Sequence, residues 1–260
     1  MRAKILTICF LALIVLQVPS LAAEQAVTFE YQSTILQNYM RDIRFDGDIG
    51  YCSYSNGLKV YDFSDPTNPV LISEFDHGQY KGMAMEFDFY GNYLYLPISN
   101  VGILIIDNSD PYNLTEAGFY PIADFLMEVK QHNGYLYLAK RLNDAVVFDL
   151  VDPVNPVEIS SLSTGSRTTI GLDIAGDILG LVHYYYGIRF YDISDPTNPE
   201  YLSVYDPYGN ESDLKIVGNI AYVTGRGYGL SIVDISNPSY PTQIGQYDPV
   251  DDEEYIEGAR

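Results

Sequence analysis

Hydrophobic and polar residues alternate along most of this chain in short runs, and turns rich in glycine, asparagine or aspartate separate the runs. Residues 83–89 show the pattern, because they alternate in character, stop at the turn Gly91-Asn92 and are followed by another alternating run at residues 93–97. A period of two is typical of β-strands with one buried face, and Gly-Asn or Gly-Asp pairs favour tight hairpins. No stretch with a helical period competes with these strands. The pattern therefore predicts an all-β fold.

A longer pattern repeats along the chain. Residues 57–69 read Gly-Leu-Lys-Val-Tyr-Asp-Phe-Ser-Asp-Pro-Thr-Asn-Pro, and they recur closely at residues 187–199 and in shorter form at residues 229–238. Weaker copies occupy residues 102–111 and 145–156. The aligned aspartates are Asp62, Asp107, Asp149, Asp192 and Asp234, which places successive copies 42 to 45 residues apart. Five copies at this period indicate a repeat architecture.

Each copy contains enough residues for four short strands. Two strands flank the glycine turn, the Gly-Leu-x-Val-x-Asp segment forms the third, and the proline-rich turn precedes a short fourth. A four-stranded unit of about 42 residues that cannot bury both faces alone is typical of a β-propeller blade. We predict one β-propeller domain over residues 24–260, with repeats at about 36–78, 79–122, 123–166, 167–208 and 209–250.

The form Gly-Leu-Ser-Ile-Val-Asp-Ile-Ser-Asn-Pro at residues 229–238 resembles the LVIVD repeat of surface-exposed and secreted proteins of bacteria and archaea. The resemblance extends over about residues 41–248, and the Ser-Asp-Pro-x-Asn-Pro turn makes it specific. The third copy departs most, with Asn143-Asp144 in place of the first glycine and Val151 in place of serine. The resemblance implies a propeller with a surface binding or scaffolding role, and it supplies no catalytic residues.

The first 23 residues have the pattern of a secretory signal peptide. Arg2 and Lys4 precede an apolar run at residues 5–18, and small residues follow up to Ala23. We therefore expect a secreted or cell-surface protein, and no later apolar run is long enough to span a membrane. At the other end, residues 251–260 resemble the start of another repeat, and residues 27–34 resemble an outer strand without its partners. These features favour an N-terminal part of a longer protein; a complete five-bladed ring with frayed ends is the alternative.

Composition narrows the range of partners. The chain has 14 lysines and arginines against 35 aspartates and glutamates, a formal charge of −21. This charge argues against nucleic acid and against anionic membrane surfaces, because it offers no basic stripe that could displace phosphate counterions. Cys52 is the one cysteine outside the predicted signal peptide, so an intrachain disulfide in the mature chain is excluded.

An acidic residue recurs five positions before the first hairpin turn of four repeats. These residues are Asp42, Glu86, Glu128 and Asp213, whereas the fourth repeat has Gly171 at this position and Asp173 two residues later. Residues repeated around a propeller axis could form a ring of carboxylates that binds Ca²⁺. Alternatively, each carboxylate could accept hydrogen bonds from a neighbouring blade and hold the blades together. We favour this structural role and expect no cofactor.

The repeats differ most in the loop between the second and third strands. These loops should share one face of the propeller, and they carry tyrosines and several of the few cations. The candidate ligand-binding residues are Arg141, Tyr184, Tyr185, Tyr186, Arg226 and Tyr228. Tyrosine and arginine are enriched where proteins recognise partners, although tyrosines that merely flank strands would give the same sequence.

The sequence favours a non-catalytic, exported β-propeller that binds or displays a protein or carbohydrate at the cell surface. A secreted enzyme is the alternative, such as a glycosidase using a pair of inner-strand carboxylates. That chemistry requires acids that differ from their counterparts in other blades, whereas the inner acids of this chain mostly repeat. A purely structural segment of a larger surface protein is a third interpretation.

Overall fold

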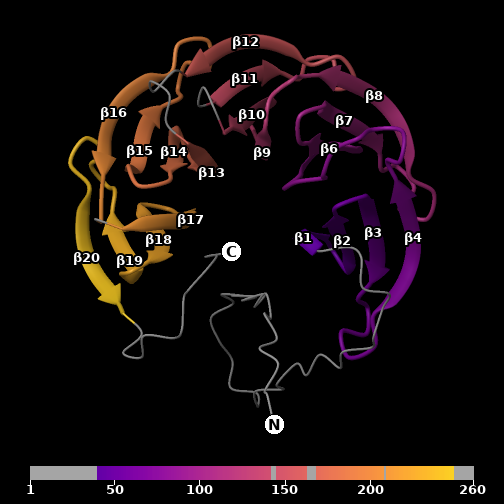
Figure 1. Cartoon of the computed structure of the whole chain (residues 1–260), viewed down its shortest axis with the longest axis horizontal. Coiled ribbons are helices and arrows are strands. Elements are labelled where there is room, and N and C mark those ends of the chain that lie inside the picture. Colours follow the sequence, from indigo (N-terminus) through magenta and orange to yellow (C-terminus); the bar gives the residue numbers. More distant parts are fainter. Residues whose placement is uncertain (1–39, 142–144, 163–167, 208, 249–260) are drawn as a thin grey trace.

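The computed structural model describes residues 40–141, 145–162, 168–207 and 209–248, and all regular structure in these ranges is β-strand. Twenty strands form five four-stranded antiparallel sheets, which are arranged around a common centre as the blades of a five-bladed β-propeller (Figure 1). The predicted all-β propeller is therefore confirmed. No helix in the described ranges is long and apolar enough to cross a membrane.

In each blade the strands follow the chain from the innermost to the outermost (Figure 1). Blade 1 contains β1 (Met40–Asp46), β2 (Ile49–Tyr54), β3 (Gly57–Asp62) and β4 (Val70–Asp76); blade 2 contains β5 (Asp88–Tyr90), β6 (Tyr93–Ile98), β7 (Gly102–Asp107) and β8 (Thr115–Pro121). Blade 3 contains β9 (Leu126–His132), β10 (Tyr135–Lys140), β11 (Ala145–Asp149) and β12 (Val157–Leu162); blade 4 contains β13 (Thr169–Ala175), β14 (Ile178–His183), β15 (Gly187–Asp192) and β16 (Glu200–Tyr205). Blade 5 contains β17 (Asn210–Val217), β18 (Ile220–Arg226), β19 (Gly229–Asp234) and β20 (Thr242–Tyr247).

The repeated turns explain why the strands end where they do. Gly47, Gly91, Gly176 and Gly218 have φ between 56° and 60° at the first hairpin of their blades, a backbone region that glycine enters without steric cost. In the proline-rich turn of blade 4, Asp192 Oδ1 accepts a hydrogen bond from the Ser194 N–H at 2.8 Å, and the aligned aspartates of the other blades do the same for the residue two positions on. These hydrogen bonds replace the ladder contacts that the following proline cannot make.

Neighbouring blades are joined at the outer rim as well as in the core. Ser73 Oγ donates to the Pro111 carbonyl at 2.6 Å, Ser160 Oγ to Pro196 at 2.7 Å, and Ser203 Oγ to Pro238 at 2.5 Å. Each bond runs from the fourth strand of one blade to the proline-rich turn of the next. The turn of one repeat is therefore also the acceptor for the preceding repeat.

The hydrophobic core is divided into four clusters, and each cluster lies between two successive blades. Tyr51 and Val60 of blade 1 pack with Leu94 and Leu104 of blade 2, and the other three clusters repeat this arrangement for blades 2–3, 3–4 and 4–5. Among the described residues no cluster joins blade 5 to blade 1. In Figure 1 no described strand lies between these two blades.

The first strand of blade 2 is shorter than the alternating residues 83–89 predict. Only Asp88–Tyr90 forms a ladder with β6, while Ala84 makes an isolated bridge with Ile98. Pro97 lies where the aligned Ala139 of blade 3 pairs with Glu128, but proline has no N–H to donate. The Glu86 carbonyl instead accepts from the Val129 N–H of blade 3 at 3.2 Å, so this segment is held partly by its neighbouring blade.

The predicted signal peptide, residues 27–34 and residues 251–260 lie outside the described residues.

Candidate functional site

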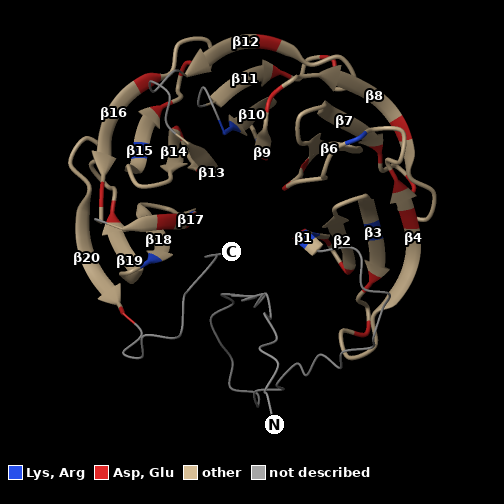
Figure 2. Cartoon of the chain, viewed as in Figure 1, with Lys and Arg blue, Asp and Glu red and all other residues tan. Residues whose placement is uncertain are grey.

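The innermost strands place a row of charged side chains around the centre of the propeller. The position three residues before the first hairpin turn is occupied by Arg44, Asp88, Lys130, Asp173 and Lys215 in blades 1 to 5. These residues share one register, because each pairs with the same position of the second strand. The sign of the charge alternates from blade to blade. Acidic residues are spread over all five blades (Figure 2).

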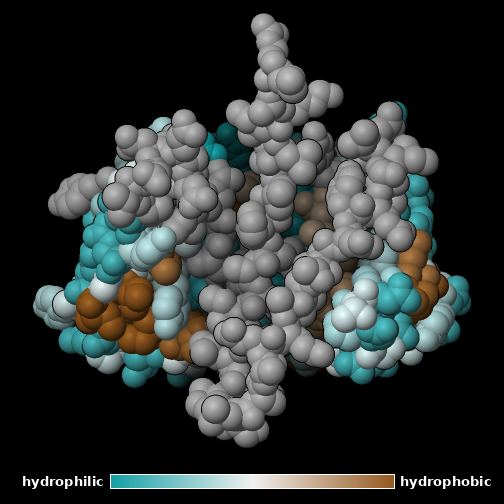
Figure 3. Space-filling model, turned by 90° about the horizontal axis from the view of Figure 1, so that it is seen from below, coloured by the Kyte–Doolittle hydropathy of each residue, from teal (hydrophilic) through white to brown (hydrophobic). Residues whose placement is uncertain are grey.

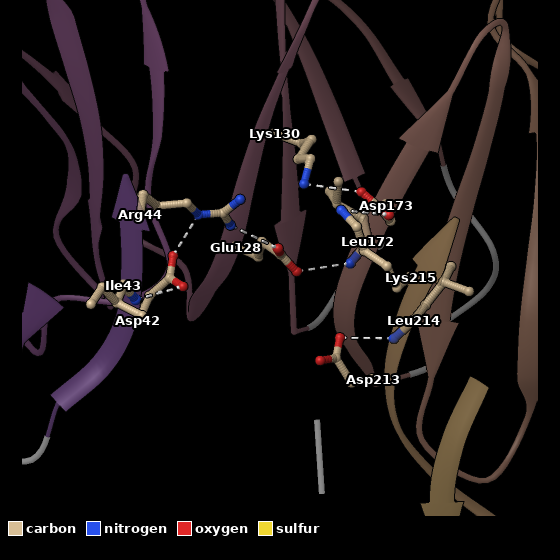
Figure 4. Close-up of a pocket in the computed structure, with 10 residues that line it drawn as sticks. All are labelled: Asp42, Ile43, Arg44, Glu128, Lys130, Leu172, Asp173, Asp213, Leu214 and Lys215. Carbon is tan, nitrogen blue, oxygen red and sulfur yellow. Dashed lines mark hydrogen bonds and ion pairs between the residues drawn. The ribbon is translucent and has the colours of Figure 1, made fainter. Parts of the chain in front are cut away.

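The inner row is held together by ion pairs. Asp173 lies between two lysines, with Lys130 Nζ at 3.0 Å from one carboxylate oxygen and Lys215 Nζ at 3.3 Å from the other. Arg44 contacts Asp42 at 2.8 Å and reaches Glu128 of blade 3 at 3.6 Å (Figure 4). Charges of opposite sign therefore meet both between adjacent blades and across the centre.

The same acids also bind the backbone of the next blade. Asp88 Oδ2 accepts from the Gln131 N–H at 2.8 Å, and Asp173 Oδ2 accepts from the Ile216 N–H at 2.7 Å. Glu128 Oε2 accepts from the Leu172 N–H at 3.1 Å. Each of these bonds links one blade to the blade that follows it, so three inner carboxylates connect blades 2–3, 3–4 and 4–5.

The ion pairs determine how these groups titrate. Burial opposes ionisation of Asp173, but Lys130, Lys215 and the Ile216 N–H together outweigh burial and hold the pKa of Asp173 below its usual value. Burial also opposes the charge of Lys130, yet Asp173, Glu128 and Asp88 raise its pKa above the usual value despite the repulsion from Arg44. These groups remain charged at neutral pH.

A cavity of about 170 Å³ opens among these residues (Figure 4). It is lined by Asp42, Ile43, Arg44, Glu128, Lys130, Leu172, Asp173, Asp213, Leu214 and Lys215. Three of the four acids of the predicted carboxylate ring line it, and Glu86 does not. Asp42 and Asp213 each accept a hydrogen bond from the N–H of the following residue, at 2.9 and 2.7 Å. In the part of the chain that the structure describes, no group of three or more His, Cys, Asp or Glu residues has the arrangement of a metal site.

The loop residues proposed to bind a ligand lie in the turns of blades 3, 4 and 5. Tyr185 and Tyr186 are 59% and 48% exposed in the β14–β15 turn, and the Tyr184 and Tyr185 rings meet edge to face with centroids 4.2 Å apart. A hydrogen bond with Tyr185 raises the pKa of Tyr184, and the nearby Arg226 charge of blade 5 partly offsets this effect. The turns of blades 4 and 5 are therefore neighbours. We call Tyr184, Tyr185, Tyr186 and Arg226 the tyrosine turn surface.

Two of the predicted loop residues are placed differently. Arg141 is exposed in blade 3, where its guanidinium lies over the Phe125 ring at 5.1 Å. Tyr228 is 5% exposed, and its ring occupies the space above Gly209 and Gly225 while its hydroxyl donates to the Thr224 carbonyl at 3.1 Å. Tyr228 therefore supports the turn of blade 5 from beneath instead of presenting its side chain to a ligand.

Beneath the tyrosine turn surface lies a buried acid that the repeat pattern did not single out. Glu211 is 1% exposed, and burial raises its pKa above the usual value. The aligned residues are Ala84 in blade 2, Leu126 in blade 3 and Thr169 in blade 4, each opposite the corresponding position of the second strand. In the sequence, the signal for Glu211 is that an acid replaces the uncharged residues found seven positions before the hairpin turn in blades 2 to 4.

Glutamine at position 211 is expected to stabilise the protein at neutral pH. A carboxyl group whose pKa is raised by folding weakens stability as the pH rises above its unfolded pKa, because the folded state disfavours the charge. Glu211→Gln should therefore raise the melting temperature at pH 7 by a few degrees and have little effect at pH 4. Thermal unfolding followed by circular dichroism at both pH values checks this prediction. A variant that is less stable at pH 7 than at pH 4, relative to wild type, would contradict it.

A model of the LVIVD repeat matches the chain at residues 39–77, 81–121, 127–164 and 208–249, which correspond to blades 1, 2, 3 and 5. These matches cover more than half of the sequence. The chain belongs to the LVIVD repeat family. Blade 4 falls between the matched segments, yet it has the same four strands and the same proline-rich turn. The resemblance seen in the sequence is thus confirmed.

Solved structures that resemble this LVIVD repeat protein show its fold alone, because they share little sequence with it. One is the computationally designed protein Ika8, with a TM-score of 0.64 and 11% identity over 81% of this chain. Another is a protein from Lactobacillus plantarum, with a TM-score of 0.67 and 12% identity over 76% of this chain. A hypothetical selenium-binding protein from Sulfolobus tokodaii has a TM-score of 0.64 and 14% identity over 78% of this chain. The alignments span 63%, 67% and 59% of those three proteins. No curated protein matches the sequence significantly.

Proposed function

We propose that this LVIVD repeat protein is an exported, non-catalytic binding module of the cell surface. In this proposal the tyrosine turn surface recognises a protein or carbohydrate partner, and the five blades hold that surface rigidly. The observation that carries the proposal is the backbone of Tyr185, an exposed tyrosine in a left-handed conformation with φ of 67°.

The conformation of Tyr185 is unfavourable for a tyrosine. The aligned turn positions carry Asn100 in blade 2, with φ of 64°, and Gly227 in blade 5, with φ of 98°. Asparagine and glycine adopt this region readily, whereas a bulky side chain does so at a cost in free energy. Residues with a strained backbone are concentrated at functional sites when they do not serve the hydrophobic core. Tyr185 does not serve the core, because it is 59% exposed. A binding role accounts for a tyrosine at this position; packing in the core does not.

The chemistry of the surface suits partners with flat apolar faces and hydroxyl or carboxylate groups. Tyrosine rings give rigid contact area at a low entropic cost and can stack against sugar rings or aromatic side chains. Arg226 adds a planar donor next to Tyr184, on a protein whose formal charge is −21. A local cation on an acidic protein favours neutral or acidic partners at this one surface.

The inner cavity gives less support to the alternative, a secreted glycosidase. A general acid needs a pKa raised toward neutrality, whereas the pKa of Asp173 is held low by two lysines. Glu211 has a raised pKa, but at 1% exposure it lies out of reach of a substrate. We therefore assign the inner acids to blade-to-blade contacts.

Screening of the mature chain on a glycan array and with a displayed random-peptide library tests the proposal. Ligands that bind should lose affinity for a variant carrying Tyr185→Ser, Tyr186→Ser and Arg226→Ser. They should bind unchanged to the control variant Tyr112→Ser with Tyr240→Ser, whose tyrosines are 61% and 78% exposed in turns at the opposite end of the blades. Equal loss in both variants, or loss in the control alone, would count against this surface.

Replacement of Tyr185 by asparagine is expected to raise stability slightly. Asparagine tolerates the left-handed region, as Asn100 shows in blade 2, so the free energy of unfolding should rise by about 0.5–1 kcal/mol. Urea denaturation of wild type and Tyr185→Asn measures this difference. A clear loss of stability would show that Tyr185 has a structural role.

A further inference from the structure

Blade 5 exposes the face that the preceding blades bury. In blades 2 and 3 the second-strand tyrosines Tyr95 and Tyr137 are 0% and 1% exposed, whereas the aligned Tyr222 of blade 5 is partly exposed. Ile105 of blade 2 is fully buried, and its counterpart Ile232 is partly exposed. We call this side of blade 5, formed by Ile220, Tyr222, Leu230, Ile232 and Ile244, its rear face. Figure 3, which views the molecule from below Figure 1, shows a hydrophobic patch over blade 5 on the left.

The charged inner row is also incomplete on this side. Asp173 lies between two cations, Lys130 and Lys215, and binds both. The Lys130 side chain is 15% exposed and has acids on both of its sides, since Asp88 of blade 2 also acts on it. The Lys215 side chain is 41% exposed, and no described blade follows it.

We propose that the rear face of blade 5 is a docking surface for a further four-stranded blade of the LVIVD type, whose inner strand carries aspartate or glutamate three residues before its hairpin turn. Such a carboxylate would meet Lys215 in the way that Asp173 meets Lys130. The apolar residues of its second and third strands would cover Tyr222, Leu230 and Ile232.

The residues that face a preceding blade show what the docking blade must supply. Leu94, Leu136, Leu179 and Ala221 occupy the aligned position in blades 2 to 5, and all four are fully buried against the preceding blade. An apolar residue there, together with the inner acid, matches the rear face of blade 5 in both polarity and charge. Two like charges at the inner position would repel instead.

Charge also decides against a second copy of this chain as the occupant. If blade 1 of another molecule docked on blade 5, Arg44 would occupy the inner position next to Lys215. In addition, the face of blade 1 that would make this contact is already partly covered by its own aromatic rings, because Phe45 and Phe63 meet edge to face at 5.1 Å over Gly50.

The test appends one repeat to the full chain. A copy of residues 209–247 is placed after Arg260, either unchanged or with Lys215→Asp in the copy alone. The aspartate copy should raise the melting temperature by about 3–6 °C over the unchanged copy. It should also slow hydrogen exchange of β18 and β19 amides in the original blade 5 at least about tenfold relative to the unextended chain. Unchanged exchange with both copies, or equal melting of the two, would overturn the proposal.

A second set of variants isolates the charge pair. Lys215→Ala in the original blade 5 should remove most of the difference between the two appended copies. Lys59→Ala should leave that difference intact, because Lys59 pairs with Glu74 at 3.0 Å within blade 1. A difference that survives Lys215→Ala would show that the inner acid does not act through this lysine, and the proposed partner chemistry would be wrong.

Discussion

Replacing Asp173 with asparagine is expected to lower the free energy of unfolding by about 3–5 kcal/mol. The Asp173 side chain is 2% exposed and binds two lysines and the Ile216 N–H of the next blade. Asparagine keeps the shape but removes the charge, which leaves Lys130 buried without its nearest carboxylate. Most of the loss should come from Lys130, because the Lys215 side chain is 41% exposed and water screens its charge.

The effect of Asp173 should depend on pH in a defined direction. Its folded pKa lies below the usual value, so its contribution is fully present above the unfolded pKa near 4 and is lost as the pH falls through the folded pKa. Urea denaturation of wild type and Asp173→Asn should therefore give a large difference at pH 7 that shrinks progressively below about pH 4. Glu74→Gln is the matched control, since its exposed pair with Lys59 should contribute less than about 1 kcal/mol. An Asp173→Asn variant as stable as this control would refute the structural role of the inner row.

Shortening the isoleucine side chain at one position of the repeat is expected to lower the free energy of unfolding by very different amounts in two blades. Ile105→Ala in blade 2 should lower the free energy of unfolding by about 3–4 kcal/mol, because Ile105 is fully buried against blade 3. Ile232→Ala in blade 5 should cost only about 1–2 kcal/mol, because no described blade covers this side chain and part of it already contacts water. Both values come from the same denaturation experiment. Equal losses would show that the rear face of blade 5 is as well packed as the interfaces between blades.

Local chemistry made the architecture predictable. The glycine turns, the alternating strands and the aspartate that accepts from the residue two positions on are all short-range features, and they repeat five times. A four-stranded unit with two apolar faces buries them only by packing against neighbouring units, so the repeat predicted a propeller. The Ser203–Pro238 contact between blades illustrates what the repeat could not reveal, because its partners are 35 residues apart and belong to different units.

The inner charges were harder to interpret from the sequence. Attention to the acids five residues before the turn identified Glu128 and Asp42, but the alternating row two residues later includes lysine and arginine and does not repeat in identity. In a single strand, Lys130 or Lys215 has the pattern of an ordinary solvent-facing residue. Their roles depend on neighbours in the next blade, which only the ring brings within reach.

The sequence also could not predict which loop residues are buried. Tyr228 and the exposed Tyr186 have the same sequence context, because each directly precedes the glycine that begins the third strand of its blade. Tyr228 is buried because Gly209, which directly precedes β17, and Gly225 of β18 leave space for its ring. The tyrosine turn surface accordingly does not include Tyr228.

The affinity of Tyr185→Asn for a selected ligand tests the central claim most directly. The measurement compares wild type and variant by titration calorimetry, with the tightest glycan or peptide obtained from the two screens as the probe. We expect binding at least about tenfold weaker in a variant that is as stable as wild type or more so, because a strained, exposed aromatic residue would have been exchanged for a relaxed one. An unchanged dissociation constant would contradict the assignment of recognition to this turn.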